Sequence, residues 1–487
     1  MTTQTHAASG DGRQHQPVLL RSATVVDVRD GTHLPATDVL VKDGTIADVR
    51  PGIDADGIQG LHVIEARGQY LVPGYNDMHA HPLGQTRQDQ TRDLKLMLAH
   101  GVTGFRQMSG SIKLLRDRAA GVLDLPESSP ALLATPGPLL ITLLNAATEE
   151  QVVATVREQH EAGADFIKAA MVTPEVFFAA QAEALRLGTT IVGHLPPGID
   201  VRKASRLGMK SIEHLGPGVG LFACCSPDGA HLRHDDAGER KAPKLPPFKL
   251  PLMDQIMERV VKKLVVNPIN RSSPEDVERI RRAAGGFDER LASELAEQFV
   301  ADGTWQVPTL IRVKTQQLCD ASEFAEDPAL RYMDAGTLKR WRKAAAKFAE
   351  FSAETRATFR TMYERQLRLT RIFDAAGVPM LAGSDCSGAA WVVPGRSLHR
   401  EFDELGDAGV SPLRVLQMAT LRAAEFLGRT ATMGTVAPGK AADLVLLEAD
   451  PLESVGNLHR IAGVVRAGRH YSAAELTALK ERAAAEH

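Results

Sequence analysis

Short apolar runs alternate with amphipathic helical segments through the middle of the chain, and this order constrains the fold more than any other feature. A parallel pair of strands needs a crossover, usually a helix, so the alternation predicts a parallel sheet. About eight such units predict an α/β fold of the (β/α)8 TIM-barrel type over residues 71–430. A doubly wound open sheet is the alternative, but no glycine-rich phosphate loop follows the first strand. The expected strands lie near residues 72–81, 102–107, 138–142, 165–169, 190–194, 210–214, 305–310 and 379–385.

Both ends of the chain hold short apolar runs separated by turn residues. Near the start, Lys42-Asp43-Gly44 lies between two such runs, and Asp-Gly favours a tight hairpin turn. Residues 442–447 form a similar run near the end. We expect residues 17–70 and 431–475 to build one small β-sandwich domain beside the barrel, although two unrelated β segments would show the same pattern. Residues 1–16 are polar, and we expect them to be a disordered N-terminus.

One connection is too long for an ordinary barrel. About 90 residues separate the expected strand at His214 from the next one at Trp305, which predicts an insertion at about residues 217–300. Amphipathic helices are expected at about 252–266 and 274–300 within it. A lid over the ends of the strands is one interpretation. A contact between subunits and an insertion without a function are the others.

The composition excludes several classes of protein. The chain has 487 residues and a net charge of −3, so we expect no basic surface of the kind that binds nucleic acid. No apolar stretch is long enough to span a membrane, and the first residues lack the apolar core of a secretory signal. The four cysteines include the adjacent pair Cys224-Cys225 and form no CxxC motif. This cysteine usage fits a reducing cytoplasm best. We also expect a homo-oligomer that acts on a small molecule.

Ionisable residues recur where the expected strands end. His79-Ala80-His81 closes the first strand, and side chains at positions i and i+2 of a strand point the same way. Each residue alone is more often structural, but barrel active sites lie at the C-terminal ends of the strands. Imidazole and carboxylate together suit zinc, manganese or iron. The candidate metal ligands are His79, His81, Lys168, His194, His214 and Asp385.

The motifs around these residues resemble those of the amidohydrolase superfamily over nearly the whole chain. The contexts of Lys168 and of Glu213-His214 are most similar to the branch of Xaa-Pro dipeptidases and imidazolonepropionase-like amide hydrolases. The tail from Gly434 to Leu444 resembles the return of that family into a small β domain. The further motifs are Val72-Pro73-Gly74, Asp77-Met78-His79-Ala80-His81, Gly101-Val102-Thr103-Gly104, Gly163-Ala164-Asp165-Phe166-Ile167-Lys168 and Ala382-Gly383-Ser384-Asp385.

The resemblance implies a role for each candidate ligand. His79, His81 and Asp385 would bind a first divalent ion, the α ion, and His194 and His214 a second, the β ion, with zinc as the expected metal. Lys168 would be carbamylated by carbon dioxide, and its carbamate would bridge the two ions. A bridging hydroxide would then attack an amide or peptide-type C–N bond, with Asp385 as general base and then general acid.

Other activities stay open. A mononuclear deaminase, or a hydrolase of cyclic amides or lactones from the same superfamily, is the main alternative. Lys168 distinguishes this alternative from the two-metal hydrolase, because those enzymes need no bridging carbamate. A barrel that serves only in assembly is a third possibility. The branch would also place a tyrosine shortly after His194, and this sequence has Leu195-Pro196-Pro197-Gly198 there. Residues that could contact the substrate, each with an ordinary structural explanation as well, are Gln107, Arg106, Arg312 and His399.

Overall fold

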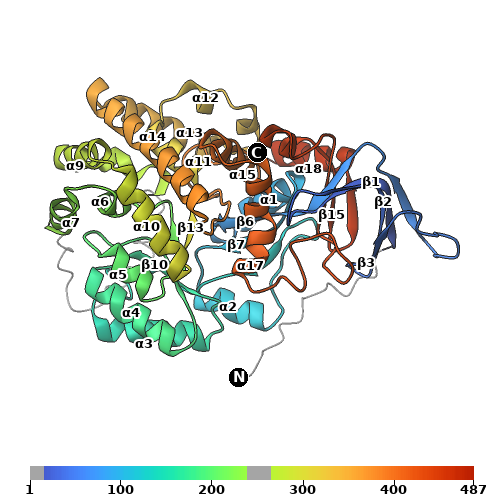
Figure 1. Cartoon of the computed structure of the whole chain (residues 1–487), viewed down its shortest axis with the longest axis horizontal. Coiled ribbons are helices and arrows are strands. Elements are labelled where there is room, and N and C mark those ends of the chain that lie inside the picture. The colour runs from blue at the N-terminus through green and yellow to red at the C-terminus, as the bar shows by residue number, and fades with distance from the viewer. Residues whose placement is uncertain (1–15, 239–264, 487) are drawn as a thin grey trace.

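The computed structural model describes residues 16–238 and 265–486. Most of the expected N-terminal tail and of the expected helix at 252–266 therefore lies outside the described residues. Parallel strands occupy the middle of the molecule with helices around them, and a separate sheet lies at one end (Figure 1). Within the described ranges no helix is long and apolar enough to cross a membrane.

The central strands are all parallel to their neighbours, as the alternation predicted. Three of them pair in the order β6-β7-β8, and five pair in the order β13-β12-β11-β10-β9. Isolated parallel bridges, Gln306 to Met380 and Ala80 to Cys386, place the segment 380–386 between β13 and β6. The strands are β6 Tyr75–Ala80, β7 Val102–Gln107, β8 Ala131–Ala134, β9 Leu140–Ile141, β10 Ile167–Met171, β11 Ile191–Gly193, β12 Ser211–Glu213 and β13 Trp305–Val307.

Two of the expected strands differ from the structure. The third, expected at 138–142, is the two-residue β9, which pairs with β10, and a further strand, β8, precedes it and pairs with β7. Pro136 and Pro138 lie between the two strands and lack the N–H that a ladder needs. The eighth, expected at 379–385, forms isolated bridges rather than a regular strand. The described ladders are therefore interrupted between β8 and β9.

Helices cover the outside of the central strands. Their starts follow local chemistry: in α3 the hydroxyl of Thr148 accepts a hydrogen bond from the Gln151 N–H, and Val152 and Val156 are buried. The helices of this layer are α1 Arg87–Ala99, α2 Ile112–Ala119, α3 Glu149–Glu161, α4 Pro174–Arg186, α5 Val201–Arg206, α10 Glu289–Asp302, α11 Leu310–Gln317, α14 Ala353–Ala376, α15 Arg396–Asp407, α16 Pro412–Ala419 and α17 Leu421–Phe426.

The expected insertion is helical where it is described. The single helix expected at 274–300 is two helices, because Gly286 ends the first and Asp288 caps the second by accepting from the Leu291 N–H. The second, α10, packs against α5 and α14 in the outer layer (Figure 1). The other helices outside this layer are η1 Pro82–Gly84, α6 Gly220–Cys224, α7 Gly229–Gly238, η2 Pro268–Arg271, α9 Pro274–Gly285, α12 Ser322–Ala325, η3 Pro328–Tyr332, α13 Ala335–Ala349 and η4 Val455–His459.

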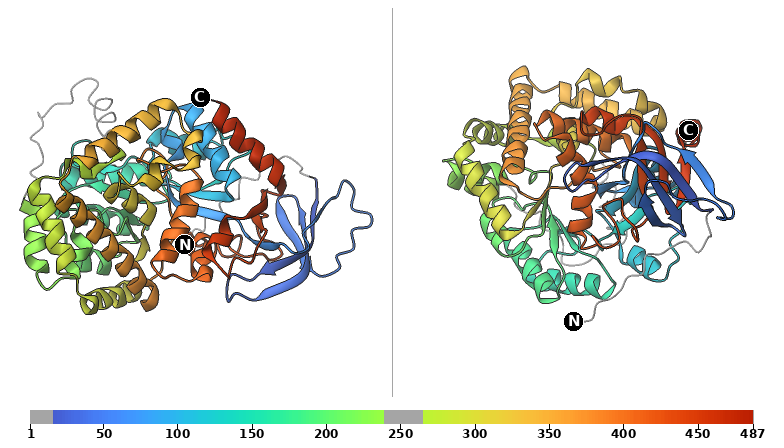
Figure 2. Two further views of the ribbon diagram at one scale, coloured as in Figure 1. Left: turned by 90° about the horizontal axis from the view of Figure 1, so that it is seen from above. Right: turned by 45° about the vertical axis from the view of Figure 1, so that its right-hand side comes forward.

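Both ends of the chain contribute strands to one sheet, which lies beside the central strands in both views of Figure 2. Its order is β16-β15-β14-β5-β1-β2-β3, with β4 also pairing with β1. Asp43 and Gly44 both have positive φ, as the Asp-Gly hairpin turn predicts. A sandwich needs two facing sheets, whereas the described strands of this region form one. They are β1 Val18–Val26, β2 His33–Lys42, β3 Thr45–Arg50, β4 His62–Glu65, β5 Tyr70–Pro73, β14 Leu444–Leu447, β15 Ile461–Arg466 and β16 Arg469–Ser472, and α18 Ala473–Ala485 follows.

Candidate metal centre

The four histidines singled out in the sequence lie side by side. The ring centroids of His79 and His81 are 5.4 Å apart, and those of His79 and His214 are 4.5 Å apart. His194 continues the group, with its ring 5.2 Å from that of His214. All four histidines lie at or just after the C-terminal ends of strands β6, β11 and β12. Because these strands are parallel, their C-terminal ends lie on the same side and bring the histidines together.

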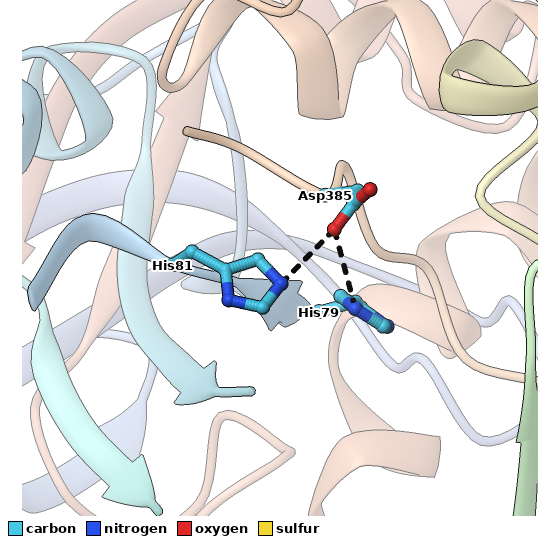
Figure 3. A group of neighbouring side chains, drawn as sticks. All are labelled: His79, His81 and Asp385. Carbon is cyan, nitrogen blue, oxygen red and sulfur yellow. Dashed lines mark ion pairs between the residues drawn. The ribbon is translucent and has the colours of Figure 1, made fainter. Parts of the chain in front are cut away.

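Asp385 completes one end of this group. Its Oδ1 atom lies 3.3 Å from Nε2 of His79 and 3.1 Å from Nε2 of His81 (Figure 3). One ligand atom from each of the three residues lies within 4.8 Å of the others. Two imidazole nitrogens and a carboxylate oxygen in this arrangement can hold a divalent ion.

The other ring nitrogen of each histidine already has a partner. Metal-binding histidines characteristically donate this second N–H to an oxygen, which fixes the tautomer and turns the free nitrogen toward the ion. In this group Nδ1 is engaged and Nε2 is left for a ligand role. The Nδ1 contacts are His79 to Glu213 Oε2 at 2.6 Å, His81 to Ser109 Oγ at 2.9 Å, His214 to Thr309 Oγ1 at 2.6 Å and His194 to the Ala170 carbonyl at 3.2 Å.

Lys168 is buried, and its Nζ has no hydrogen-bond partner among the described residues. Burial lowers the pKa of its amine to about 8, against the opposing charges of Glu213 and Asp385. A glycine on the next strand makes room for the side chain, since a Cβ on Gly193 would lie 3.0 Å from Cδ of Lys168 and 2.2 Å from the carbonyl oxygen of Ala169. An unpaired buried ammonium is costly, so the position favours an uncharged amine or a modified one.

Burial and charge set the protonation of the group. Burial, reinforced by Lys168, lowers the pKa of His194 to about 3, so its ring is neutral, as a metal ligand requires. Burial opposes ionisation of Asp385, but His214 and His79 outweigh it and hold the pKa of that carboxyl well below its ordinary value. The carboxylate is therefore charged at neutral pH.

Left-handed backbone at the strand ends helps to gather these side chains. Alternation along β12 would send Glu213 and His214 to opposite sides, but His214 has a φ of 57° and turns the chain there. Both residues therefore reach His79. Asp385, with a φ of 58°, lies at a similar turn. The sequence motif contained Glu213, but strand alternation gave no reason to place it in the site, and Ser109 and Thr309 carried no sequence signal.

The four residues named as possible substrate contacts lie in different places. Arg312 is beside the site, with its Nε 3.1 Å from Oδ2 of Asp385. Arg106 is fully buried and donates to Glu213, and Gln107 donates to the carbonyl of Ser109. Nε2 of His399 donates to the His100 carbonyl. The ring lies against Tyr75, the first residue of β6, whereas His79 lies near the end of that strand. A substrate contact for Arg106, Gln107 and His399 stays a prediction.

Parts of the chain are similar in sequence to known hydrolases and deaminases. A family model described as the Amidohydrolase family matches residues 273–470. A dihydroorotase of Carboxydothermus hydrogenoformans is 33% identical over 94 residues, which cover 19% of this chain and 21% of that protein. An adenine deaminase of Paracoccus denitrificans is 37% identical over 70 residues, covering 14% of this chain and 12% of that protein. The chain thus matches about a fifth or less of the length of these relatives.

Solved structures are similar over almost the whole chain. A bottromycin amidohydrolase has a TM-score of 0.67 and 24% identity, over 97% of this chain and 90% of that chain. An Xaa-Pro dipeptidase with methionine bound in its active site has a TM-score of 0.59 and 18% identity, over 94% of this chain and 100% of that chain. These likenesses define a TIM-barrel-type α/β fold. The Amidohydrolase family model, which matches residues 273–470, agrees with the resemblance of the motifs to the amidohydrolase superfamily.

Proposed function

We propose that the protein is a metal-dependent hydrolase of an amide or peptide-type C–N bond. The observation that carries the proposal is the state of the four imidazoles, each engaged at Nδ1 and each with Nε2 left for an ion, next to a buried carboxylate and an unpartnered lysine. A set of structural histidines would not need this common arrangement. The names of the similar proteins, which include a dihydroorotase, adenine deaminases and an Xaa-Pro dipeptidase, support chemistry at such a bond.

In this proposal the ligands form two sets. His79, His81 and Asp385 hold the α ion, and His194 and His214 hold the β ion, with zinc as the expected metal. Lys168 carries a carbamate, formed when its neutral amine attacks carbon dioxide and loses a proton, and the new carboxylate joins the two sets. The ions, when bound, would lower the pKa of a water molecule and polarise the scissile carbonyl.

Asp385 is the group that moves the proton. Its Oδ1 faces the imidazoles and its Oδ2 faces Arg312, so both oxygens are fixed before a substrate arrives. The carboxylate accepts the proton of the attacking water and then donates it to the leaving nitrogen. Of the residues named as possible substrate contacts, Arg312 is the one that borders this reaction, and we propose it as the candidate that contacts substrate.

A mononuclear enzyme is the second candidate. The compact set formed by His79, His81 and Asp385 alone favours a single ion. The names of the dihydroorotase and adenine deaminase matches support hydrolysis of a cyclic amide or deamination as the reaction. The two candidates differ at Lys168, which a single-ion enzyme does not need. One ion per chain together with an unmodified Lys168 would support the second candidate against the first.

Substitution of the proposed ligands tests the proposal. We expect Asp385→Asn to lower turnover of a confirmed amide substrate roughly 10²–10⁴-fold, the usual contribution of a general acid–base group. Lys168→Ala and His79→Ala are expected to lose metal and activity together. His160→Ala and Lys347→Ala change exposed residues of the same types on outer helices and should leave activity unchanged. Full turnover in all three site variants would overturn the proposal.

A further inference from the structure

Glu213 is a fully buried carboxylate whose two oxygens are both engaged. Its Oε1 accepts from Arg106 Nη2 at 2.9 Å and from Ser211 Oγ at 2.6 Å. Its Oε2 lies 3.1 Å from the same Arg106 nitrogen and 2.6 Å from Nδ1 of His79. The side chain of Glu213 is 0% exposed. The carboxylate therefore connects an arginine directly to one of the proposed metal ligands.

Arg106 is held rigidly on the other side of this carboxylate. Its Nε donates to the Met78 carbonyl at 2.6 Å, one residue before His79. Its guanidinium carbon lies 4.8 Å from the centroid of the Phe426 ring and 5.5 Å from that of Phe166. A charge locked between aromatic rings and a backbone oxygen keeps its geometry, so Glu213 cannot rotate away from His79 without breaking several contacts.

The partner of His79 differs in kind from the partners of the other three histidines. His81 and His214 contact hydroxyl groups, and His194 contacts a backbone carbonyl. An ionised carboxylate accepts a hydrogen bond but cannot donate one, so it fixes the tautomer of His79 with a proton on Nδ1. Its charge also makes the bond stronger than one to a neutral acceptor and raises the basicity of the free nitrogen.

We propose that Glu213, held by Arg106, is a positioning residue that makes the set His79, His81 and Asp385 the tighter of the two cation sites. The inference rests on the proposed function, because it assumes that both sets bind ions. It gives the buried ion pair of Glu213 and Arg106 a role, although removing two charges from water is energetically costly. The β ion, whose histidines contact neutral oxygens, is correspondingly the weaker one.

A titration of metal-free protein with Co²⁺ tests this inference without measuring turnover. Wild-type protein is expected to bind two ions of unequal affinity, and the visible absorption of the first equivalent reports its ligands. In Glu213→Gln the amide oxygen can still accept from His79 but the charge is lost. We expect the tighter affinity to fall roughly 10–100-fold, the usual effect of removing such a partner, while the weaker one changes little.

Thr309→Val is the matched control, since it removes the neutral partner of His214 without a change of shape. It should weaken the β ion and leave the first equivalent unchanged. If Glu213→Gln does not fold, the double variant Arg106→Gln with Glu213→Gln, which replaces the ion pair by two amides, takes its place and should show the same loss.

The outcomes of the Co²⁺ titration distinguish failure of the inference about Glu213 from failure of the proposed metal-dependent function. Equal affinities in wild type, or an unchanged first equivalent in the Glu213 variants, would overturn the inference and leave the proposed function standing. A loss that is equal for both ions would also overturn it, because it would show a general structural role. A wild-type protein that binds no ion would overturn the proposed function itself.

Discussion

Nε of Arg312 lies 3.1 Å from Oδ2 of Asp385, the carboxylate oxygen that does not face His79 and His81. The guanidinium also donates at 2.6 Å to the carbonyl of Val265, which lies within the predicted insertion. Asp385 is thus held from two sides, by imidazoles and by a guanidinium. Arg312 therefore contacts both the predicted insertion and the candidate site.

This contact predicts that Arg312 orients the proton-transferring carboxylate. Arg312→Gln frees Oδ2, and a carboxylate displaced by about 1 Å can cost on the order of 10²-fold in rate. We expect kcat to fall by about that factor while the metal content stays near that of wild type. Arg356→Gln removes a surface contact with Asp320 and serves as the control, with no change in kcat expected. An Arg312 variant with wild-type kcat would contradict the assignment.

Gly193 is predicted to be required for the position of Lys168. The φ of Gly193 is 127°, and a Cβ there would meet the Ala169 carbonyl oxygen at 2.2 Å. Gly193→Ala should therefore displace β10 and cost roughly 1–3 kcal/mol of stability, the usual range for overpacking. Thermal unfolding and metal content check this. Gly285→Ala, whose Cβ would meet nothing within 4 Å, should change stability by no more than about 1 kcal/mol.

Glu183 is predicted to stabilise the protein at neutral pH but not in acid. Hydrogen bonds from Arg186 and Arg157 lower its pKa from the ordinary 4.5 to about 2. A lowered pKa means that the stabilisation is fully present above about pH 4.5 and disappears as the pH falls toward 2. Glu183→Gln should therefore unfold at a lower denaturant concentration than wild type at pH 7 and at the same concentration near pH 2. A difference that is the same at every pH would contradict this prediction.

The carbamate predicts a requirement for carbon dioxide during metal loading. Metal-free protein should recover activity faster in bicarbonate than in degassed buffer, because the bridging ligand forms only from a neutral amine and carbon dioxide. Lys168→Ala should show no bicarbonate effect, and small carboxylates such as formate or propionate should restore part of its activity. Equal recovery with and without bicarbonate would favour the mononuclear alternative.

The proposed ligands could be found in the sequence because their positions follow from strand geometry. His79 and His81 share a side of β6 through the two-residue period, and the parallel strands end at one face. Their partners could not be found in this way. Ser109, Glu213 and Thr309 come from three other parts of the chain, and only the folded strands bring them to Nδ1 of the histidines.

The errors in the fold have local physical causes. Only the short β9 lies in the range expected for the third strand, 138–142, because Pro136 and Pro138 separate it from β8, a strand that the sequence pattern did not predict. The helix expected at 274–300 is broken by the glycines that precede Asp288. Domain boundaries, the homo-oligomer and the cytoplasmic location stay predictions, since neither the strand pattern nor the site depends on them.

The most direct test of the account is amine release by metal-depleted protein before and after zinc is added back. The substrates are N-acyl amino acids, dipeptides and cyclic amides, with lactones included to detect ester cleavage. We predict that depleted protein is inactive and that about two zinc ions per chain restore hydrolysis of at least one C–N substrate. Turnover that is the same with and without metal would contradict the central claim.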